Sequence, residues 1–331
     1  MFQIDPDIRK AKTLPSDFYT DERFFALSKE KIFARTWQFA GRVADLATLT
    51  PVDLFGEPLL LVRGKDGLQC MSNVCTHRGK ILVEEACDAN LIRCGYHGRR
   101  FSLDGKFLSM PEFDGVENFP SAADDLTSVA AGEAGGFAFV SLDPIASLRE
   151  FVSDDATAAL GSGELKLTST REYPLNAHWA LYCENYLEGF HIPFVHKSLN
   201  EIVDYGSYST DLFRYSSVQT GYDADGKVAG RYAFVFPNTM FNFYPWGVSV
   251  NVVRPVSASE TVVEFLTYVS DESLVGEGAG GDLHRVEMED EAVVESVQRG
   301  IRSRYYSHGR YSPTREQGTH HFHRLIAEFL Q

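Results

Sequence analysis

The pattern of apolar and polar positions divides the chain into a helical start, a β-rich first part and a mixed second part. Thr20-Asp21-Glu22 offers an N-cap and an acidic first turn, and apolar residues then recur at helical spacing at Phe25, Ile32, Phe33 and Trp37. We therefore expect an amphipathic helix near the N-terminus. From about residue 40 to 145 the apolar runs become short and are separated by turn residues, which predicts a small antiparallel β domain.

Three segments carry this β prediction. The run Leu59–Val62 leads into the turn Gly64–Gly67, and the run Phe101–Leu103 meets a turn at Asp104-Gly105. The last strand of the domain is expected at Gly136–Leu142, just before Pro144. These turns predict hairpins, so neighbouring strands should pair in an antiparallel manner.

The second part mixes longer strands with helices. Strands are expected at Tyr232–Phe236 and Thr261–Leu266, with a hairpin turn at Asp223–Gly226 and a flexible loop at Gly276–Gly281. A long helix is expected from about Asp282 to Tyr305, followed by a C-terminal segment with helical periodicity. The pattern predicts an antiparallel sheet covered by helices, so the fold class of the whole chain is α+β.

Composition and charge narrow the classes of function. The 331 residues are 44% hydrophobic and 23% charged, which is typical of a soluble globular protein and allows two domains. No run approaches the roughly eighteen uninterrupted apolar residues of a membrane helix, and the first residues lack the apolar core of a signal peptide, so we expect a cytoplasmic protein with no membrane partner. A formal net charge of −15 opposes nucleic-acid binding.

Two short motifs in the β-rich part each offer one thiolate and one imidazole. Cys75-Thr76-His77 is followed, after sixteen intervening residues, by Cys94-Gly95-Tyr96-His97. If both cysteines bind one iron and both histidines bind the other, the result is a [2Fe–2S] cluster of the Rieske type, which relays single electrons. A Cys2His2 zinc site is the alternative, but zinc fingers pair Cys with Cys and His with His at close spacing.

Other residues near these motifs also enter the prediction. Glycines beside the ligands are expected to let backbone N–H groups approach the bridging sulfurs; they are Gly79, Gly95 and Gly98. The three remaining cysteines are expected to be reduced thiols without a disulfide framework; they are Cys70, Cys87 and Cys183. Basic residues around the motifs, including Arg99, suggest a docking face for an acidic electron donor, although a solvated charged surface is the simpler interpretation.

On these motifs the chain resembles the Rieske non-haem iron oxygenases, whose large subunit carries a Rieske domain before a mononuclear-iron domain. The resemblance implies an N-terminal helical segment at residues 1–39 that packs on the catalytic domain. It further implies a Rieske domain at residues 40–145 and a catalytic domain of helix-grip type at residues 146–331. An iron-binding motif should then follow downstream.

Such a motif begins at Asn185 and continues through Glu188 to His191 and His196. His196 comes five positions after His191, a spacing that would splay the two side chains apart on one continuous helix. We expect Pro193 to end a helix just after His191, so that His196 folds back beside it. Taken alone, the pair could equally be ordinary polar histidines at a helix end.

A third ligand is predicted from the helix that contains Val286–Ile301. At about 100° per residue, apolar side chains form one stripe made of Val286, Val293, Val294, Val297 and Ile301. Asp290 falls in the middle of this stripe. Glu287 and Glu289 lie on the flanks of the stripe, whereas Glu291 and Glu295 point away from it. Glu295 is placed to pair with Arg299. An unpaired carboxylate among valines would be costly, so a metal partner explains Asp290. Two imidazoles and one carboxylate form the facial triad of iron(II) oxygenases.

The resemblance assigns roles to the rest of the motif. Asn185 and Glu188 match catalytic positions of the family, and Glu188 corresponds to the acid that connects the two metal centres. We expect Glu188 on the same helical face as His191, and in contact with His77 or His97 of the next subunit of a homotrimer. A Glu at this position, where Asp is commoner, is similar to the choline and carnitine monooxygenase branch.

The resemblance therefore implies the oxygenase component of a multicomponent system. Electrons would come from NAD(P)H through a separate reductase, a ferredoxin or both, because the chain has no nicotinamide or flavin fingerprint. The expected reaction is O2-dependent hydroxylation or oxidative demethylation of a small organic substrate, with a methylated ammonium compound favoured. Aromatic-ring hydroxylation or O-demethylation stays open, and a Rieske electron carrier without oxygenase activity is the alternative from another class.

Three further signals are weighed against simpler explanations. His320-His321-Phe322-His323 is explained by a C-terminal amphipathic helix, so no iron is assigned to it. Phe241, Phe243, Tyr244 and Trp246 could line a pocket for a cation, but alternation in a buried strand is the simpler interpretation. His178 and Tyr182 precede the iron motif and are candidates for the wall of the pocket.

Overall fold

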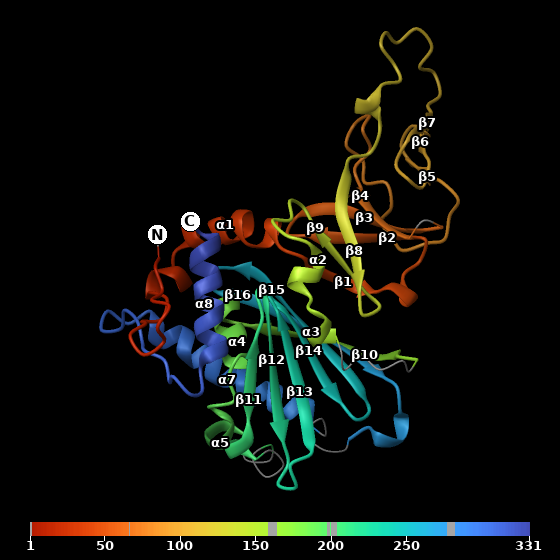
Figure 1. Cartoon of the computed structure of the whole chain (residues 1–331). Coiled ribbons are helices and arrows are strands. Elements are labelled where there is room, and N and C mark those ends of the chain that lie inside the picture. The colour runs from red at the N-terminus through yellow and green to blue at the C-terminus, as the bar shows by residue number, and fades with distance from the viewer. Residues whose placement is uncertain (1, 66, 158–163, 197–198, 200–203, 277–281) are drawn as a thin grey trace. The chain divides into compact units, whose positions relative to one another are not determined.

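The computed structural model describes all residues except 1, 66, 158–163, 197–198, 200–203 and 277–281 (Figure 1). Most of the loop predicted at Gly276–Gly281 therefore lies outside the described residues. The chain forms two compact units, which we call the small unit, Ala34–Leu148, and the large unit, Met1–Phe33 with Arg149–Gln331. The predicted α+β class is confirmed, with a β domain in the small unit and an antiparallel sheet with helices in the large one.

The small unit contains two antiparallel sheets. The larger has the strand order β1-β9-β8-β4-β3-β2 and the smaller the order β5-β6-β7. Their bounds are β1 Gln38–Arg42, β2 Leu49–Leu54, β3 Glu57–Gly64, β4 Gly67–Ser72, β5 Ile92–Arg93, β6 Arg100–Phe101, β7 Phe107–Ser109, β8 Ser128–Ala134 and β9 Phe137–Ser141. The predicted hairpin through Gly64–Gly67 joins β3 to β4, and the turn after Phe101 joins β6 to β7.

Strand β3 shows how the sequence builds this unit. Four consecutive residues, Leu59 to Val62, are buried, because alternate side chains enter two different cores. Leu60 and Val62 pack in the core that also holds Cys75 and Cys94, whereas Leu59 and Leu61 pack in the core formed with β9. The continuous apolar run is therefore the signature of a strand buried on both faces, and one of those faces supports the two cysteine motifs.

The large unit is built on a seven-stranded antiparallel sheet with the order β10-β16-β15-β14-β13-β12-β11. The strands are β10 Lys166–Leu175, β11 Ser209–Leu212, β12 Ser216–Tyr222, β13 Val228–Val235, β14 Thr239–Tyr244, β15 Gly247–Ser257 and β16 Glu260–Val269. The helices are α1 Glu22–Lys31, α4 Trp179–Tyr186, α5 Ile192–Val195, α7 Leu283–Ile301 and α8 Gln317–Phe329, and the short helices α2 Leu148–Phe151 and α3 Asp154–Thr157 precede β10. The predicted turn at Asp223–Gly226 connects β12 and β13, which pair in an antiparallel manner.

Helices α4 and α8 lie on the sheet of the large unit (Figure 1), and aromatic side chains pack them together. Phe322 of α8 meets Trp179 of α4 with ring centroids 5.7 Å apart, and it meets Phe234 and Phe236 at 5.6 and 5.9 Å. Helix α4 is in turn neighboured by α7 and β15. This packing holds α4 next to α7, and the two helices carry Asn185 and Asp290 of the predicted iron site.

The N-terminal helix is shorter than predicted. Asp21 caps α1 by accepting a hydrogen bond from the backbone N–H of Arg23, but the helix ends at Lys31, and Trp37 lies beyond it next to β1. The apolar residues that follow the helix are buried because the chain enters a 3-10 turn at Phe33–Arg35. Phe33 packs on Trp179, and Phe18 packs on His178, so this segment covers the start of α4. Among the described residues, no helix combines the length and the apolar character needed to span a membrane.

Candidate cluster and iron sites

The two cysteine motifs of the small unit fold as two loops with the same backbone pattern. In the first loop Cys75 N donates to Lys80 O at 2.8 Å and Gly79 N donates to Cys75 O at 3.0 Å. In the second, Cys94 N donates to Arg99 O at 2.8 Å and Gly98 N donates to Cys94 O at 3.1 Å. Each loop is thus closed by its own backbone, with its cysteine buried beneath it.

Two of the predicted glycines shape these turns. Gly79 and Gly98 have φ values of +72° and +74°, a region that favours glycine. Their N–H groups donate to the cysteine carbonyl oxygens, and the approach of neighbouring backbone N–H groups to the bridging sulfurs stays a prediction. The requirement for glycine is conformational, since a Cβ at Gly79 would meet no atom within 4 Å.

Asp124 connects the two loops, a role that no local pattern of residues indicates. Its carboxylate accepts a hydrogen bond from the guanidinium of Arg99 at 2.6 Å, and its backbone oxygen accepts from Thr76 Oγ1 at 2.8 Å. Arg99 is 2% exposed and its guanidinium lies over the rings of Phe107 and Phe119, so it is not part of a basic surface face as predicted. Its charge lowers the pKa of the Asp124 carboxyl below the usual range, chiefly through their hydrogen bond.

The four predicted cluster ligands come together in pairs. His77 Nδ1 lies 3.2 Å from His97 Nδ1, and Cys75 and Cys94 are buried in the same core. The cysteines are 3% and 2% exposed, whereas both imidazoles reach the surface of the unit in part. Two buried thiols opposite two outer imidazoles fit a cluster in which each iron takes one kind of ligand.

In the large unit the histidine pair forms by a different route from the one predicted. Helix α4 ends at Tyr186, and Pro193 lies in the first turn of a new short helix, α5, instead of ending the first helix. Proline is tolerated there because first-turn N–H groups have no partner within a helix. His191 and His196 occupy the two caps of α5, with ring centroids 5.1 Å apart, so the predicted proximity is correct.

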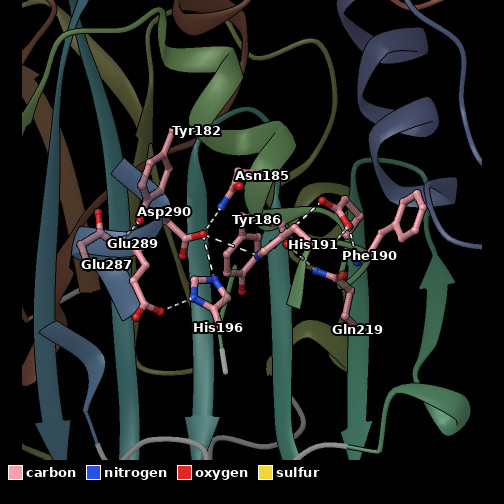
Figure 2. A network of polar contacts seen from close by, with 11 residues as sticks. Tyr182, Asn185, Tyr186, Phe190, His191, His196, Gln219, Glu287, Glu289 and Asp290 are labelled. Atoms are coloured by element: carbon pink, nitrogen blue, oxygen red, sulfur yellow. Dashed lines mark hydrogen bonds and ion pairs between the residues drawn. The ribbon is translucent and has the colours of Figure 1, made fainter. Parts of the chain in front are cut away.

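Asp290 of α7 completes the group that the sequence predicted. Its Oδ1 lies 3.0 Å from His196 Nε2 and 3.5 Å from His191 Nε2, and it accepts a hydrogen bond from Asn185 Nδ2 at 2.6 Å (Figure 2). One ligand atom from each of His191, His196 and Asp290 lies within 4.8 Å of the others. Two Nε2 atoms and one carboxylate oxygen that converge in this way fit a facial triad.

A second carboxylate holds the far nitrogen of each histidine. Glu188 Oε1 lies 2.8 Å from His191 Nδ1, and Glu289 Oε2 lies 2.8 Å from His196 Nδ1. Burial lowers the pKa of His196, but the hydrogen bonds and charges of Asp290 and Glu289 outweigh it and raise this pKa. A carboxylate on Nδ1 keeps the proton there and leaves Nε2 free for a metal, which is the usual environment of a metal-binding histidine.

Glu188 differs from its prediction in one respect. It lies in the connection between α4 and α5, and not on a helical face shared with His191. Its carboxylate accepts hydrogen bonds from the backbone N–H groups of Phe190 and His191 as well as contacting the His191 ring. The acid therefore stabilises the turn that brings His191 into place.

The buried face of α7 is not the valine stripe. Its buried residues are Glu287, Val294, Gln298 and Ile301, while Val297 is 42% exposed. The apolar stripe indicated Asp290 correctly, because this residue lies between Glu287 and Val294 on the same face of the helix. The stripe placed Glu287 and Glu291 too far from the buried face. The Glu295 carboxylate accepts hydrogen bonds from the backbone N–H and the side chain of Asn176. These bonds take the place of the predicted pair with Arg299.

A cavity of about 110 Å³ opens beside the predicted iron ligands. Its aromatic wall consists of Tyr182, Tyr186, Tyr208, Tyr232, Tyr244 and Phe265, and its polar wall includes Asn242, Ser249, Asn251 and Glu287. Of the aromatic strand residues predicted, only Tyr244 lines this cavity; Phe241 and Phe243 are buried elsewhere, and Trp246 faces a neighbouring pocket. Tyr208, just before β11, and Tyr232 of β13 were missed because no local motif marks either position.

The remaining candidates have structural partners. His178 is fully buried as the N-cap of α4 and does not line the cavity, whereas Tyr182 does. In α8, His323 contacts Tyr311 and Glu184, and His320 Nε2 lies 2.8 Å from the backbone oxygen of Asp5. These contacts explain two histidines of the C-terminal tract by packing.

Comparison with known proteins supplies the family. Residues 36–120 match the model of the Rieske [2Fe-2S] domain, and residues 208–331 match that of the ring hydroxylating alpha subunit catalytic domain. Choline monooxygenase of Arabidopsis thaliana is 31% identical over 99% of this chain and 86% of its own length. The chain belongs to the Rieske oxygenase alpha subunits.

Other relatives support the same family. The carnitine monooxygenase oxygenase subunit of Escherichia coli K12 is 31% identical over 98% of this chain and 95% of its own length. The crystal structure of the quaternary ammonium Rieske monooxygenase CntA with L-carnitine has a TM-score of 0.83 at 29% identity, covering 99% of this chain and 97% of that one. Naphthalene 1,2-dioxygenase, at 18% identity and a TM-score of 0.80, shares the fold.

Membership settles several of the predictions. The protein is an oxygenase with a Rieske [2Fe–2S] cluster and the mononuclear iron of its family, and dioxygen is its co-substrate. The alternatives of a zinc-binding module and of an electron carrier without oxygenase activity are therefore wrong. Rieske oxygenases accept electrons from a reductase or a ferredoxin, as predicted.

Proposed function

We propose that this Rieske oxygenase hydroxylates or oxidatively demethylates a methylated ammonium compound, with iron held by His191, His196 and Asp290. Bound iron(II) in such a triad supplies dioxygen activation and keeps coordination positions open for it. The chain's own residues would orient this centre: Glu188 and Glu289 fix the histidine rings, and Asn185 holds Asp290 through their hydrogen bond.

The observation that carries the substrate class is the wall of the cavity. Six aromatic rings line it, and none of the described lining residues is a lysine or an arginine. The negative faces of aromatic rings attract cations, and a quaternary ammonium group has no hydrogen to donate, so rings are suitable partners for it. The chain's relatives include enzymes named for choline and carnitine, which supports the same class.

For the electron path we propose a homotrimer in which Glu188 connects the iron of one subunit to the cluster of the next, through His77 or His97. The contact between Glu188 Oε1 and His191 Nδ1 supports the iron side of this path. The solved structure of a quaternary ammonium Rieske monooxygenase, 28% identical to this chain, gave insight into inter-subunit electron transfer in that enzyme. An NAD(P)H-dependent reductase, with or without a ferredoxin, would supply the electrons to the cluster. In the cluster, Cys75 and Cys94 would hold one iron, and His77 and His97 would hold the other.

Glu188→Gln tests the path. The variant should keep both metal centres but reduce product formation strongly, because a neutral amide cannot hold the His191 ring with a charge-assisted bond. Iron content, the cluster's visible spectrum and the rate of cluster oxidation by dioxygen with substrate present should be measured together. An unchanged turnover rate with a full complement of iron would contradict the proposed path.

Oxygen uptake with a surrogate reductase tests the substrate class. Choline, carnitine and glycine betaine should stimulate uptake and yield a product, while neutral aromatic compounds of similar size should not. Product identification must accompany the measurement, because uncoupled oxygen reduction also consumes dioxygen. Turnover of an aromatic ring compound with no turnover of any ammonium compound would refute the proposal.

A further inference from the structure

One carboxyl group of the cavity wall takes no part in the predicted iron site. Glu287 of α7 is 3% exposed and lines the cavity. Its Oε2 accepts a hydrogen bond from the Tyr182 hydroxyl at 2.7 Å, whereas its Oε1 is buried and has no hydrogen-bond partner among the described residues (Figure 2). A buried polar atom without a partner is costly, so a role toward a ligand is the natural explanation for its presence.

A polar network fixes the orientation of this carboxyl group. Tyr182 donates to Glu287 Oε2, and in the adjoining wall Ser249 donates to Asn251 Oδ1 at 3.0 Å. The single proton of the Tyr182 hydroxyl is used in the bond to Glu287, so Tyr182 orients this carboxyl group. All four residues line the cavity, so the network ends at the free oxygen of Glu287.

The other two acids of the described cavity wall are already engaged. Glu188 contacts the ring of His191, and Asp290 contacts both histidines and Asn185. Both acids belong to the iron site, where their charge would be balanced by the metal. Glu287 is thus the acid available to a substrate in this wall.

The charges around Glu287 make the cavity responsive to a cation. Burial raises the pKa of the Glu287 carboxyl well above its ordinary value; the hydrogen bond from Tyr182 opposes this, while Asp290 and Glu291 on the same helix add to it. From β15 only the neutral side chains of Ser249 and Asn251 contribute to the network. A positive group in the cavity would offset the negative charge and favour the carboxylate, whereas an uncharged ligand would not.

We propose that Glu287, oriented by Tyr182, is the specificity-determining residue of the cavity, where the negative charge of its carboxylate favours the cationic head of the substrate over an uncharged group of the same shape. This inference rests on the proposed function, since it assumes that the substrate is an ammonium compound. The aromatic wall supplies shape and dispersion contacts that a neutral group shares, and Glu287 supplies the charge that only a cation can use.

Equilibrium binding to the iron-loaded protein without oxygen tests the inference. Choline and 3,3-dimethylbutan-1-ol differ only in the replacement of N⁺ by carbon, so the ratio of their affinities measures the preference for charge. Glu287→Gln keeps the size of the side chain and its ability to accept from Tyr182 but cannot carry a charge. We expect this variant to lower that ratio by about tenfold or more, a change of about 1.4 kcal/mol, with the affinity for the neutral alcohol nearly unchanged.

Two further variants serve as matched tests. Tyr182→Phe removes the group that orients Glu287 and should also lower the ratio, although by less. Glu295→Gln makes the same chemical change on the same helix, at a residue that binds Asn176 outside the cavity, and should leave the ratio unchanged. Binding of the neutral alcohol shows in each case that the cavity is intact.

The outcomes separate the role of Glu287 from the substrate class. If the parent protein binds neither compound, or binds choline no better than its carbon isostere, the proposed substrate class is wrong. If the parent prefers choline and Glu287→Gln keeps that preference, the role of Glu287 is refuted while the substrate class stands. Equal loss of affinity for both compounds in the variant would show a structural role and would also refute the inference.

Discussion

Replacement of Glu289 by glutamine tests whether the second carboxylate behind His196 is part of the iron site. Glu289 Oε2 lies 2.8 Å from His196 Nδ1, and Arg285 donates to its other oxygen at 3.1 Å. The His196 side chain is 1% exposed and that of Glu289 is 26% exposed. The bond is therefore mostly, but not fully, shielded from water.

The size of the effect follows from the change in hydrogen-bond type. A bond to a charged group contributes about 1.5–3 kcal/mol and a neutral one about 0.5–1.5 kcal/mol, so the variant should lose about 1–1.5 kcal/mol. That loss corresponds to roughly tenfold weaker iron binding, at the lower end of the range of about 10–100-fold found for such partners of metal-binding histidines. A glutamine that turns its NH2 toward Nδ1 would hold the wrong tautomer and increase the loss.

Anaerobic competition against an iron(II) chelator measures this effect directly. The visible absorption of the cluster counts intact protein in the same sample, so iron loss from the triad is separated from unfolding. Glu295→Gln, on the same helix but away from the iron ligands, is the control and should bind iron as the parent does. If Glu289→Gln also binds iron as tightly as the parent, Glu289 does not support His196 and the reasoning is refuted.

Four other changes have expected outcomes. Asp290→Ala should remove the triad's iron and abolish turnover while the cluster spectrum stays intact; retained turnover would show that another acid is the ligand. Asp124→Asn should lower the free energy of unfolding of the small unit by about 2 kcal/mol, because buried Arg99 loses its charged partner; the urea dependence of cluster absorption measures this. Since the pKa of folded Asp124 is lowered, its contribution is complete above the ordinary Asp pKa of about 4 and is lost as the pH falls through the folded value. The difference between parent and variant should therefore narrow in acid, and a constant difference would contradict the ion pair. Gly318→Ala should destabilise the large unit by about 1–3 kcal/mol, because its Cβ would overlap the carbonyl oxygen of Leu187, just past the end of α4. Gly300→Ala, in open space on α7, should be neutral or stabilising by up to about 1 kcal/mol in the same thermal unfolding assay.

Local signals in the sequence predicted the parts of the site that depend on short-range spacing. The cysteine and histidine loops, the proximity of His191 to His196 and the inward position of Asp290 all follow from residues that are close in the chain or share one helix face. The hairpins of the small unit were predicted for the same reason, since glycine and aspartate residues mark their turns.

The errors arose where a distant segment decides the outcome. Tyr182, more than a hundred residues earlier in the chain, donates a hydrogen bond to Glu287, which allows this acid to be buried. Helix periodicity alone predicted that valines, and not Glu287, form the buried face. Glu289 acts on His196, and Asp124 on two loops, through contacts that no local pattern reveals. The end of α4 was misplaced because proline both stops and starts helices, and only the surrounding packing distinguishes the two.

The length of the single turn of α5 sets the positions of the two predicted histidine ligands relative to each other. Phe194 within this turn is 77% exposed, so its side chain can be replaced without disturbing the two histidines. The length of the turn has no such freedom, because inserting one residue would rotate His196 by about 100° around the helix axis and move it about 1.5 Å along it. Homologous oxygenases with a different number of residues between these histidines would need a different connecting segment to present the same ligands.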